Sequence, residues 1–338
     1  MASNQAPHPL TSNPVPEYNP PQESNQTPKE DPNEAPKEDP KEDPDKFAKY
    51  DPIAASYATI ESRIAWDFLC GGNRHFAYYP SPSTTLSPFP ISAGQKRMQT
   101  QLLHSLSLPP YSHILDAGCG DGHVAIDLAQ RGPFVITAFD VVPRHVSRAR
   151  HNVSRAHLSP SCSIQILHLD FDSLPSLPSQ TYHGIYTSES LLHATSPSTV
   201  LSEFFRLLKP GGRLVLHEYH NDYMSPSSLP GFPATLISER HTGESAFTRA
   251  ERYFRHEMEQ AGFEDIQIND YSANIEPMAR LLSLSGAWRH VVLFLRLQKF
   301  FPNSAKREEG FAGRESWAYV SVRGTKPGVL EVPTEPQQ

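Results

Sequence analysis

The sequence predicts an α/β fold, in which an open and mostly parallel sheet carries helices on both faces. A short apolar run at Ile114–Leu115 leads into an acid and then into glycines at alternate positions, which is typical of a strand, a tight turn and a helix. After this turn, runs of strand length alternate with amphipathic runs of helical spacing. Such alternation indicates successive βαβ units, which build a parallel sheet.

The composition divides the chain of 338 residues into a globular part and two tails. Residues 1–47 are rich in Pro, Glu, Asp, Asn and Lys, repeat the motif Lys-Glu-Asp-Pro, and contain almost no large apolar side chains. Such a segment cannot bury enough apolar surface to offset its chain entropy. We therefore expect a disordered tail at 1–47, a folded domain at 48–326, and a Pro-rich disordered tail at 327–338.

Charge and cysteine content narrow the classes of partner. The formal net charge is -7 and no basic block stands out, which argues against nucleic acid as a partner. Cys70, Cys119 and Cys162 fit neither a disulfide framework nor metal-ligand spacing, so no metal is expected. No apolar run reaches bilayer-spanning length and no signal pattern begins the chain. These observations predict a soluble cytoplasmic protein, and they leave its oligomeric state open.

The region before the glycine turn is predicted to be mainly helical. Apolar and aromatic residues at helical spacing between residues 50 and 69 predict one or two helices, and residues 92–106 predict another that leads into the glycine strand. Between them lies a loop rich in glycine and polar groups at 71–76. This loop either closes over a cofactor or substrate, or is an ordinary surface turn.

The glycine turn indicates a nucleotide-type cofactor. Gly118, Gly120 and Gly122 follow Asp116, and such glycines let the chain bend back and let a ligand approach the backbone. Amides at the N-terminus of the next helix can also face a polar ligand. A dinucleotide fingerprint needs its third glycine where His123 stands, which counts against a nicotinamide oxidoreductase. Gly-x-Gly-x-Gly after an acid is instead the pattern of S-adenosylmethionine (SAM) sites.

Two later strands end in acids at positions that suit this cofactor. The predicted strand 134–140 ends in Asp140, about twenty residues beyond the turn, where a carboxylate can accept both ribose hydroxyls. The predicted strand 163–171 ends in Asp170 and Phe171. Asp170 suits a hydrogen bond from the adenine amino group, and Phe171 would lie beside the ring.

The second half of the chain continues the alternation. Ser196 is the expected cap of a helix, the Lys-Pro-Gly-Gly stretch at 209–212 ends that helix and turns the chain, and Thr248 is the expected cap of a later helix with Glu251 completing a capping box. The remaining predicted elements are helices at 143–157, 196–208 and 248–261, and strands at 182–189, 213–220, 263–271 and 316–323.

Two further segments suggest how a substrate is enclosed. Residues 221–245 are rich in Pro, Ser and Gly and follow the fifth strand, where we expect a lid. Residues 274–301 are strongly apolar and either pack on the sheet or roof the substrate pocket. A weak membrane-surface contact of this stretch is the lesser alternative.

Four motifs in this order resemble class I SAM-dependent methyltransferases. They are the glycine turn at 116–122, Asp140, the pair Asp170–Phe171, and Leu-Leu-Lys-Pro-Gly-Gly-Arg-Leu at 207–214. The resemblance implies a Rossmann-like fold: a doubly wound, mostly parallel seven-stranded sheet with helices on both faces, N-terminal helices and a lid. It also implies SAM as the cofactor, bound by Asp116, Gly118, Gly120, Gly122, Asp140, Asp170, Phe171 and Glu189.

Within this superfamily, two groups share local blocks with the chain. Glu189–His193, followed by the block 204–212, is similar to sterol 24-C-methyltransferases, but the aromatic block of that group is altered here at 70–76. Residues 66–75 resemble instead O-methyltransferases of fungal secondary metabolism, of the glandicoline B type. The resemblance implies O-methylation of a small, largely apolar molecule in secondary-metabolite biosynthesis. The alternatives are a sterol-type C-methyltransferase and a catalytically inactive SAM-fold partner protein.

The chemistry of methyl transfer sets what else the site needs. The methyl group of SAM is already activated, so the protein mainly positions the acceptor in line and excludes water. A hydroxyl acceptor also needs a base, and ligands of open α/β sheets sit at the carboxyl ends of the strands. His193 and Glu218 are the first choices, although His193 would also suit a loop cap or a cofactor contact, and Glu218 an ion pair. The other candidates are Glu189, His217 and His220.

Overall fold

The computed structural model describes residues 63–81, 89–221, 244–281 and 317–334, together with Ala54, Ala55 and Ala58. The expected tail at 1–47, nearly all of the expected lid at 221–245 and most of the apolar stretch at 274–301 lie outside these residues.

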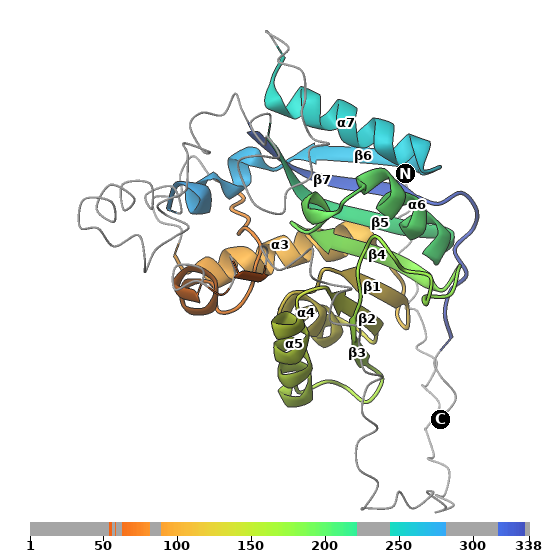
Figure 1. The fold of residues 1–338 in the computed structure, drawn as a ribbon, viewed down its shortest axis with the longest axis horizontal. Helices are drawn as coiled ribbons and strands as arrows, with labels where there is room; N and C mark the ends of the chain where they lie inside the picture. Colours follow the sequence, from red (N-terminus) through yellow and green to blue (C-terminus); the bar gives the residue numbers. More distant parts are fainter. Residues whose placement is uncertain are drawn as a thin grey trace, which may run out of the picture. The chain divides into compact units, whose positions relative to one another are not determined.

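The described residues form a seven-stranded sheet in the order β3-β2-β1-β4-β5-β7-β6 (Figure 1). The strands β1 to β5 are parallel, and β7 runs antiparallel between β5 and β6. This confirms the predicted mostly parallel, seven-stranded fold. The strands are β1 (His113–Ala117), β2 (Val135–Asp140), β3 (Ser163–His168), β4 (Tyr182–Ser188), β5 (Leu208–Asn221), β6 (Glu264–Asp270) and β7 (Trp317–Thr325).

Helices cover both faces of the sheet because successive strand residues point to opposite sides. Ile114 packs in one core with side chains of α3, α4 and α5, whereas the next residue, Leu115, packs in a second core with α6 and α7. In Figure 1, α7 lies along β6 and β7, and α4 and α5 lie at the end of the sheet formed by β1 to β3. The helices are α3 (Ile91–Leu106), α4 (His123–Arg131), α5 (Pro143–Arg155), α6 (Pro197–Leu207) and α7 (Ala246–Gln260).

The strand order reverses between β1 and β4, which fixes where a ligand can bind. From β1 the chain proceeds to β2 and β3 on one side, and β4 and β5 are then added on the other. The two connections leave the sheet in opposite directions, so a crevice opens at the carboxyl ends of β1 and β4. The glycine turn follows β1, and Glu189 follows β4.

A third core joins the N-terminal segment to the antiparallel side of the sheet. The segment begins with a π-helix, η2 (Arg63–Leu69), within the region predicted to be helical. Phe76, Ala77 and Met98 pack with Met278 and with Tyr319 of β7. Figure 1 shows the N-terminal segment and the helix at 272–281 on the same side of the molecule.

Two local predictions were wrong. The cap of α7 is Ser245, whose hydroxyl accepts a hydrogen bond from the amide of Thr248, so Thr248 lies inside the helix. The stretch 209–212, expected to be a turn, belongs to β5, with a register shift against β4. Gly211 there has a φ of 73° and lies against the backbone of Leu330, which leaves no room for a side chain.

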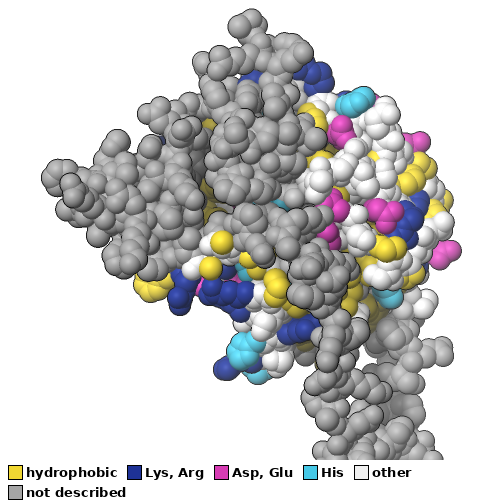
Figure 2. Space-filling view, viewed as in Figure 1, with side chains coloured by type: hydrophobic (Ala, Val, Ile, Leu, Met, Phe, Trp, Pro, Cys, Tyr) yellow, Lys and Arg dark blue, Asp and Glu magenta, His cyan; other side chains and the backbone are white. Residues whose placement is uncertain are grey.

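The surface of the described residues is mixed in character. On the face drawn in Figure 2, apolar, acidic and basic side chains are interspersed, and basic and histidine side chains gather over the region of α5. Within the described part of the chain, no helix has the length and apolar character needed to span a bilayer.

Candidate functional site

A pocket opens at the carboxyl ends of β1, β2 and β4, where the sheet order reverses. Its space amounts to about 840 Å³, including the part open to solvent. Six of the eight predicted cofactor residues line it, as does His193. The predicted residues that line the pocket are Asp116, Gly118, Gly120, Asp140, Phe171, Glu189 and His193.

The glycine turn forms one wall of this pocket and is held by its own amides. Gly118, Gly120 and Gly122 all have positive φ, a conformation that glycine adopts without strain. The amides of Gly118 and Cys119 both donate to the carbonyl of Phe139, at 2.9 Å. These amides therefore anchor the turn to β2.

Gly118 lies in close contact with the opposite wall. A Cβ atom built there would be 2.5 Å from Ser190 Oγ and 3.2 Å from Phe171 Cζ. Only a residue without a side chain fits between these groups, so Gly118 lets the turn pack directly against Ser190 and Phe171.

Asp140 ends β2 and links the glycine turn to α5. Its Oδ2 accepts from the amide of Gly120 at 2.8 Å, and its Oδ1 accepts from the amide of Val142 at 2.8 Å and contacts His145 Nδ1 at 3.3 Å. Burial alone would raise the pKa of Asp140, but the hydrogen bonds from His145, Val142 and Gly120 together lower it. An ionised carboxylate has about four acceptor positions and three are used here, so Asp140 can still accept one ribose hydroxyl.

An acid and an aromatic ring complete the part of the pocket that suits adenosine. Asp116 is buried at the end of β1, and burial raises its pKa to about 7 while the Tyr186 hydroxyl opposes the shift. Phe171 packs edge-on against Phe139, with ring centroids 5.6 Å apart. An apolar aromatic wall beside a carboxylate matches a purine ring joined to a ribose.

Two predicted cofactor residues do not line the pocket. A Cβ atom at Gly122 would lie 3.2 Å from the Cβ atom of Ala149, so this glycine allows α4 and α5 to pack closely. Asp170 follows β3, and its Oδ1 accepts from the amide of Asp172 at 2.9 Å, which shapes the local turn. A role for these two residues in direct cofactor contact stays a prediction.

Glu189 joins three distant segments at the pocket. Its Oε1 accepts from the amide of Phe76 at 2.7 Å and from the hydroxyl of Tyr319 at 2.9 Å. Burial raises the pKa of Glu189 to about 8, and the charge of Glu218 acts in the same direction, while the two hydrogen bonds oppose the shift. Glu189 therefore connects the loop before α3, the turn after β4 and β7.

Glu218, one of the two expected bases, does not line the pocket. Its Oε1 accepts from the amides of Ser190 at 3.0 Å and Leu191 at 2.9 Å, and from the Thr187 hydroxyl at 3.5 Å. Burial raises its pKa to about 7. These contacts make Glu218 an anchor for the turn after β4.

The three candidate histidines are in different surroundings. His193 lies in the 3₁₀ turn η4 (Leu191–His193) and lines the pocket, and burial lowers its pKa to about 4, so it is neutral at pH 7. His217 is buried beside Tyr271, with ring centroids 5.9 Å apart, and burial lowers its pKa to about 3. His220 stacks on Tyr253 at 5.6 Å. Of the three, only His193 can meet a ligand in this pocket.

The loop between η2 and α3 closes one side of the pocket. Gly72, Asn73, Arg74 and His75 all line it, which favours the first of the two alternatives for this loop over an ordinary surface turn. Gln95 of α3 fixes the loop, because its Nε2 donates to the carbonyls of Asn73 and His75 at 3.3 and 3.0 Å.

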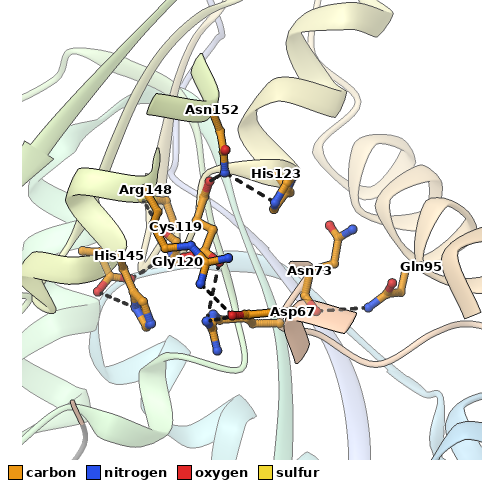
Figure 3. A network of polar contacts seen from close by, with 12 residues as sticks. Asp67, Asn73, Gln95, Cys119, Gly120, His123, His145, Arg148 and Asn152 are labelled. Carbon is orange, nitrogen blue, oxygen red and sulfur yellow. Dashed lines mark hydrogen bonds and ion pairs between the residues drawn. The ribbon is translucent and has the colours of Figure 1, made fainter. Parts of the chain in front are cut away.

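A cluster of four charged side chains ties the same segment to the glycine turn. Arg148 of α5 binds Asp67 at 3.0 Å and Asp121 at 3.1 Å, and Arg74 contacts the same two carboxylates at 3.3 and 3.5 Å. Figure 3 shows Asp67 and Arg148 pointing toward each other within this network of polar contacts. We call these four residues the charge cluster.

Sequence reasoning missed three residues of the site. His145 stands five residues after Asp140, a spacing that could have suggested a partner for that acid. Arg74 lies in the loop whose position was expected, yet no motif marked the residue itself. Tyr319 lies 130 residues from Glu189, and no local pattern connects the two.

The site residues fit SAM, judged by their own geometry. The turn brings backbone rather than side chains to the pocket at Gly118. Asp140 retains acceptor capacity for one hydroxyl, and Phe171 provides an aromatic wall. Toward β4 and the loop 72–75, the lining becomes polar, as a methionyl group would require.

Comparisons with known proteins agree with this geometry. A family model described as "Methyltransferase domain" matches residues 93–268. An S-adenosyl-L-methionine-dependent Diels-Alderase of Talaromyces variabilis is 36% identical over 81% of this chain and 94% of its own length. An O-methyltransferase of Penicillium expansum is 27% identical over 64% of this chain and 75% of its own.

A solved structure supports the same fold. The [4+2]-cyclase SpnF superimposes with a TM-score of 0.61 at 20% identity, covering 82% of this chain and 96% of its own. The family match covers more than half of the chain, and the fold and pocket agree with it. The chain belongs to the class I SAM-dependent methyltransferase family, and its cofactor is SAM.

Proposed function

We propose that this protein uses bound SAM to promote an intramolecular [4+2] cycloaddition of a small, largely apolar polyene. The observation that carries the proposal is the likeness to the SAM-dependent Diels-Alderase of Talaromyces variabilis, which is 36% identical and matched over 94% of its length. A likeness of this extent includes the pocket walls as well as the cofactor turn.

The polar groups of the site support a reaction without proton transfer. A cycloaddition forms two carbon–carbon bonds from π electrons of the diene and dienophile, and no proton leaves the substrate. Glu218 is occupied by the amides of Ser190 and Leu191, and Oε1 of Glu189 by Phe76 and Tyr319. These carboxyl groups shape the site, which is what a reaction that needs no base requires.

The residues of the chain would act mainly by enclosure and orientation. Holding diene and dienophile in one bound conformation removes much of the entropic barrier to their reaction. The loop 72–75 and the turn after β4 form the walls that would impose this conformation and exclude water. When bound, SAM supplies a fixed positive charge to such a site, together with an activated methyl group.

O-methylation of an apolar small molecule is the second candidate function. The likeness to the O-methyltransferase of Penicillium expansum favours it, and so does His193. This histidine lines the pocket and is neutral at pH 7, so it can accept a proton from a hydroxyl group. In this reaction His193 would act as the base and SAM would be consumed.

The two functions differ in what happens to the mass of the substrate and to SAM. Metabolites are extracted from cells that carry the gene and from cells that lack it, and the compounds that accumulate without the gene are incubated with purified protein and SAM. Cycloaddition yields an isomer of equal mass that has lost conjugated-diene absorption, with SAM unchanged. Methyl transfer yields a product heavier by one CH₂ group and one S-adenosylhomocysteine per product. The second outcome would replace the first proposal, and a substrate left intact under both assays would exclude both.

A further inference from the structure

Glu189 is held in an unusual conformation at the reversal of the sheet. It is the first residue after β4, and its backbone φ of 55° lies in the left-handed region, which residues other than glycine rarely adopt. Its amide donates to the carbonyl of His217 at 2.8 Å. Strained residues of this kind persist where the surrounding structure fixes them, and they cluster at functional sites.

The carboxyl group of Glu189 is fixed as firmly as its backbone. Phe76 and Tyr319, from two other segments, both donate to Oε1. The other oxygen, Oε2, accepts no hydrogen bond from any of the residues that the structure describes, and the side chain lines the pocket. One carboxyl oxygen is thus anchored, and the other remains available to a ligand.

No cation of the described protein pairs with this carboxyl group. The charged group that acts on it is Glu218, another acid, and the donors Phe76 and Tyr319 are neutral. Burial raises the pKa of the Cys70 thiol to about 12, and the charge of Glu189 acts in the same direction. This thiol is therefore uncharged. Arg74, the arginine that lines the pocket, contacts Asp67 and Asp121. An enclosed carboxylate without a cation is costly, and a cationic ligand would remove that cost.

The positions of the lining residues indicate which part of SAM would meet Glu189. Asp140 ends β2 and Phe171 lies three residues after the end of β3, where they suit ribose and adenine. The rest of the cofactor must then extend toward β4, along the loop 72–75. The sulfur is the first group beyond the ribose, and β4 ends at Glu189.

We propose that Glu189 is the charge partner of the cofactor's sulfonium and selects SAM over S-adenosylhomocysteine. The two compounds differ by one methyl group and by the positive charge on sulfur, so a carboxylate can favour SAM through its charge. Such selection keeps the charged cofactor in place, which matters most in a reaction that does not consume it. The inference rests on the SAM cofactor of the family and holds for either reaction discussed above.

Binding calorimetry with SAM, S-adenosylhomocysteine and sinefungin tests the proposal. Sinefungin carries a positive amine in place of the sulfonium methyl, so it reports charge without methyl transfer. In Glu189→Gln, which keeps the shape and the Oε1 acceptor, we expect SAM and sinefungin to bind about tenfold more weakly. Binding of S-adenosylhomocysteine should change by less than about twofold, since it offers no charge to lose.

Glu218→Gln is the matched control. It also neutralises a buried carboxyl group, but Glu218 does not line the pocket. Glu218→Gln removes a like charge that raises the pKa of Glu189, so the ratio of SAM to S-adenosylhomocysteine affinity should stay equal or rise, and not fall as in Glu189→Gln. An unchanged ratio in Glu189→Gln, or an equal loss for all three ligands, would overturn the proposal.

Proton release by the unmodified protein gives a second test that does not depend on any variant folding. The pKa of Glu189 is raised to about 8, so this carboxyl group is mostly protonated at pH 7, and a nearby sulfonium would lower its pKa. Titrations at pH 7 in two buffers of different ionisation enthalpy should therefore show proton release with SAM and little with S-adenosylhomocysteine. Several other titratable groups line the pocket. Asp116 has a pKa of about 7 and His193 a pKa of about 4, the pKa values of His75, His123 and Asp140 are lowered, and those of Cys119 and Tyr186 are raised. The remaining titratable side chains of the lining are Arg74, Asp121 and His145. Equal proton release for both ligands would assign the proton to such a group and refute the role of Glu189.

Discussion

Gly118 gives the sharpest prediction at the scale of a single residue. Gly118→Ala places a methyl group 2.5 Å from Ser190 Oγ, in a backbone with a φ of 86°. Left-handed strain costs about 1–2 kcal/mol, and overpacking adds roughly another 1–3 kcal/mol. We expect the free energy of unfolding to fall by the sum, and SAM affinity to fall with it. Urea unfolding and calorimetry measure the two effects.

Gly71→Ala is the control that separates crowding from strain. Gly71 has a φ of 59°, and no atom lies within 4 Å of a Cβ built there. In Gly71→Ala the free energy of unfolding should fall only by the cost of the left-handed strain, about 1–2 kcal/mol. Equal losses of unfolding free energy in Gly118→Ala and Gly71→Ala would show that Ser190 moves to make room for the added methyl group.

The three glycines of the turn are equivalent in the motif but not in the structure. A Cβ at Gly120 meets only Arg74 Cδ, at the ordinary distance of 3.5 Å, whereas Gly118 faces Ser190. The Gly-x-Gly-x-Gly pattern predicts that the backbone bends here, because such a bend depends on neighbouring residues. What Gly118 faces depends on a residue 72 positions away, as the hydrogen bond between Ser190 and Gly118 illustrates. No local pattern carries that information.

Glu218 illustrates the same limit for a candidate base. Residue type and position correctly placed a carboxyl group on β5 near the pocket. Its orientation toward Ser190 and Leu191 follows from the alternation of side chains across the strand and from the path of the next turn. The presence of a carboxyl group on β5 could therefore be predicted from the sequence, but the groups that this carboxyl group contacts could not.

At the scale of elements, the charge cluster makes a prediction about cofactor exchange. Arg148→Met removes the ion pairs that join α5 to Asp67 of η2 and to the fully buried carboxyl group of Asp121. A pair that is partly exposed on one side contributes about 1–3 kcal/mol, between surface and buried values. We expect SAM to dissociate several-fold faster, because the segment that closes the pocket is held less firmly. Stopped-flow displacement measures this rate.

Arg252→Met is the control for this effect. Arg252 pairs with Glu244 at 2.8 Å, but its side chain is 53% exposed and lies in α7. Exposed pairs contribute little, so this variant should leave the dissociation rate unchanged. High salt should accelerate dissociation in the unmodified protein more than in Arg148→Met. A rate that is independent of Arg148 would show that the cluster does not hold the pocket closed.

The cap of α7 provides a second prediction for an element. Ser245→Ala removes the acceptor for the amide of Thr248 and should destabilise the protein by about 1 kcal/mol. Thr248→Val keeps that amide and removes only the hydroxyl, so it should have a smaller effect. Thermal unfolding of both variants measures the difference, and a larger loss in Thr248→Val would return the cap to Thr248.

The error over this cap shows what the sequence can predict about an element. The helical spacing of apolar residues placed α7 within two residues, because burial of one face decides where a helix lies. Its first residue was less certain, since Ser245 and Thr248 both carry a hydroxyl that can cap. The prediction of a turn at 209–212 was wrong for another reason. Lys326 forms backbone hydrogen bonds with Gly211 and Gly212 and extends the strand, and it lies more than 100 residues away in the sequence.

At the scale of the whole molecule, the chain should not need its first 47 residues. Their composition cannot form a core. A protein that begins at residue 48 should keep the Tm and the SAM affinity of the full chain. A Tm lower by several degrees in the shortened protein would show that the tail packs on the domain.

The dependence of stability on pH is also a property of the whole molecule, because two groups of buried side chains act in opposite directions. Histidines with lowered pKa remain neutral in the fold, so their contribution is lost as pH falls from about 6.5 toward their folded pKa. Carboxyl groups with raised pKa remain protonated in the fold, so their contribution is lost as pH rises from about 4 through their folded pKa. The histidines are His183 and His193, with a pKa of about 4, His217, with a pKa of about 3, and His75, His113 and His123, whose pKa values are also lowered by burial. The carboxyl groups are Asp116 and Glu218, with a pKa of about 7, and Glu189, with a pKa of about 8.

The two groups offset each other between about pH 4.5 and pH 6.5, because the unfolded chain gains protons on histidines while the folded protein holds them on carboxyl groups. Above that range only the carboxyl groups still titrate, so we expect the Tm of the SAM-free protein to fall from about pH 6.5 to pH 8. Glu189→Gln removes the group with the pKa of about 8, and its Tm should fall less steeply over the same range. Calorimetric unfolding of both proteins across this range measures the slopes. A Tm that rises steadily to pH 8 would mean that these carboxyl groups are ionised in the folded protein, contrary to the raised pKa values.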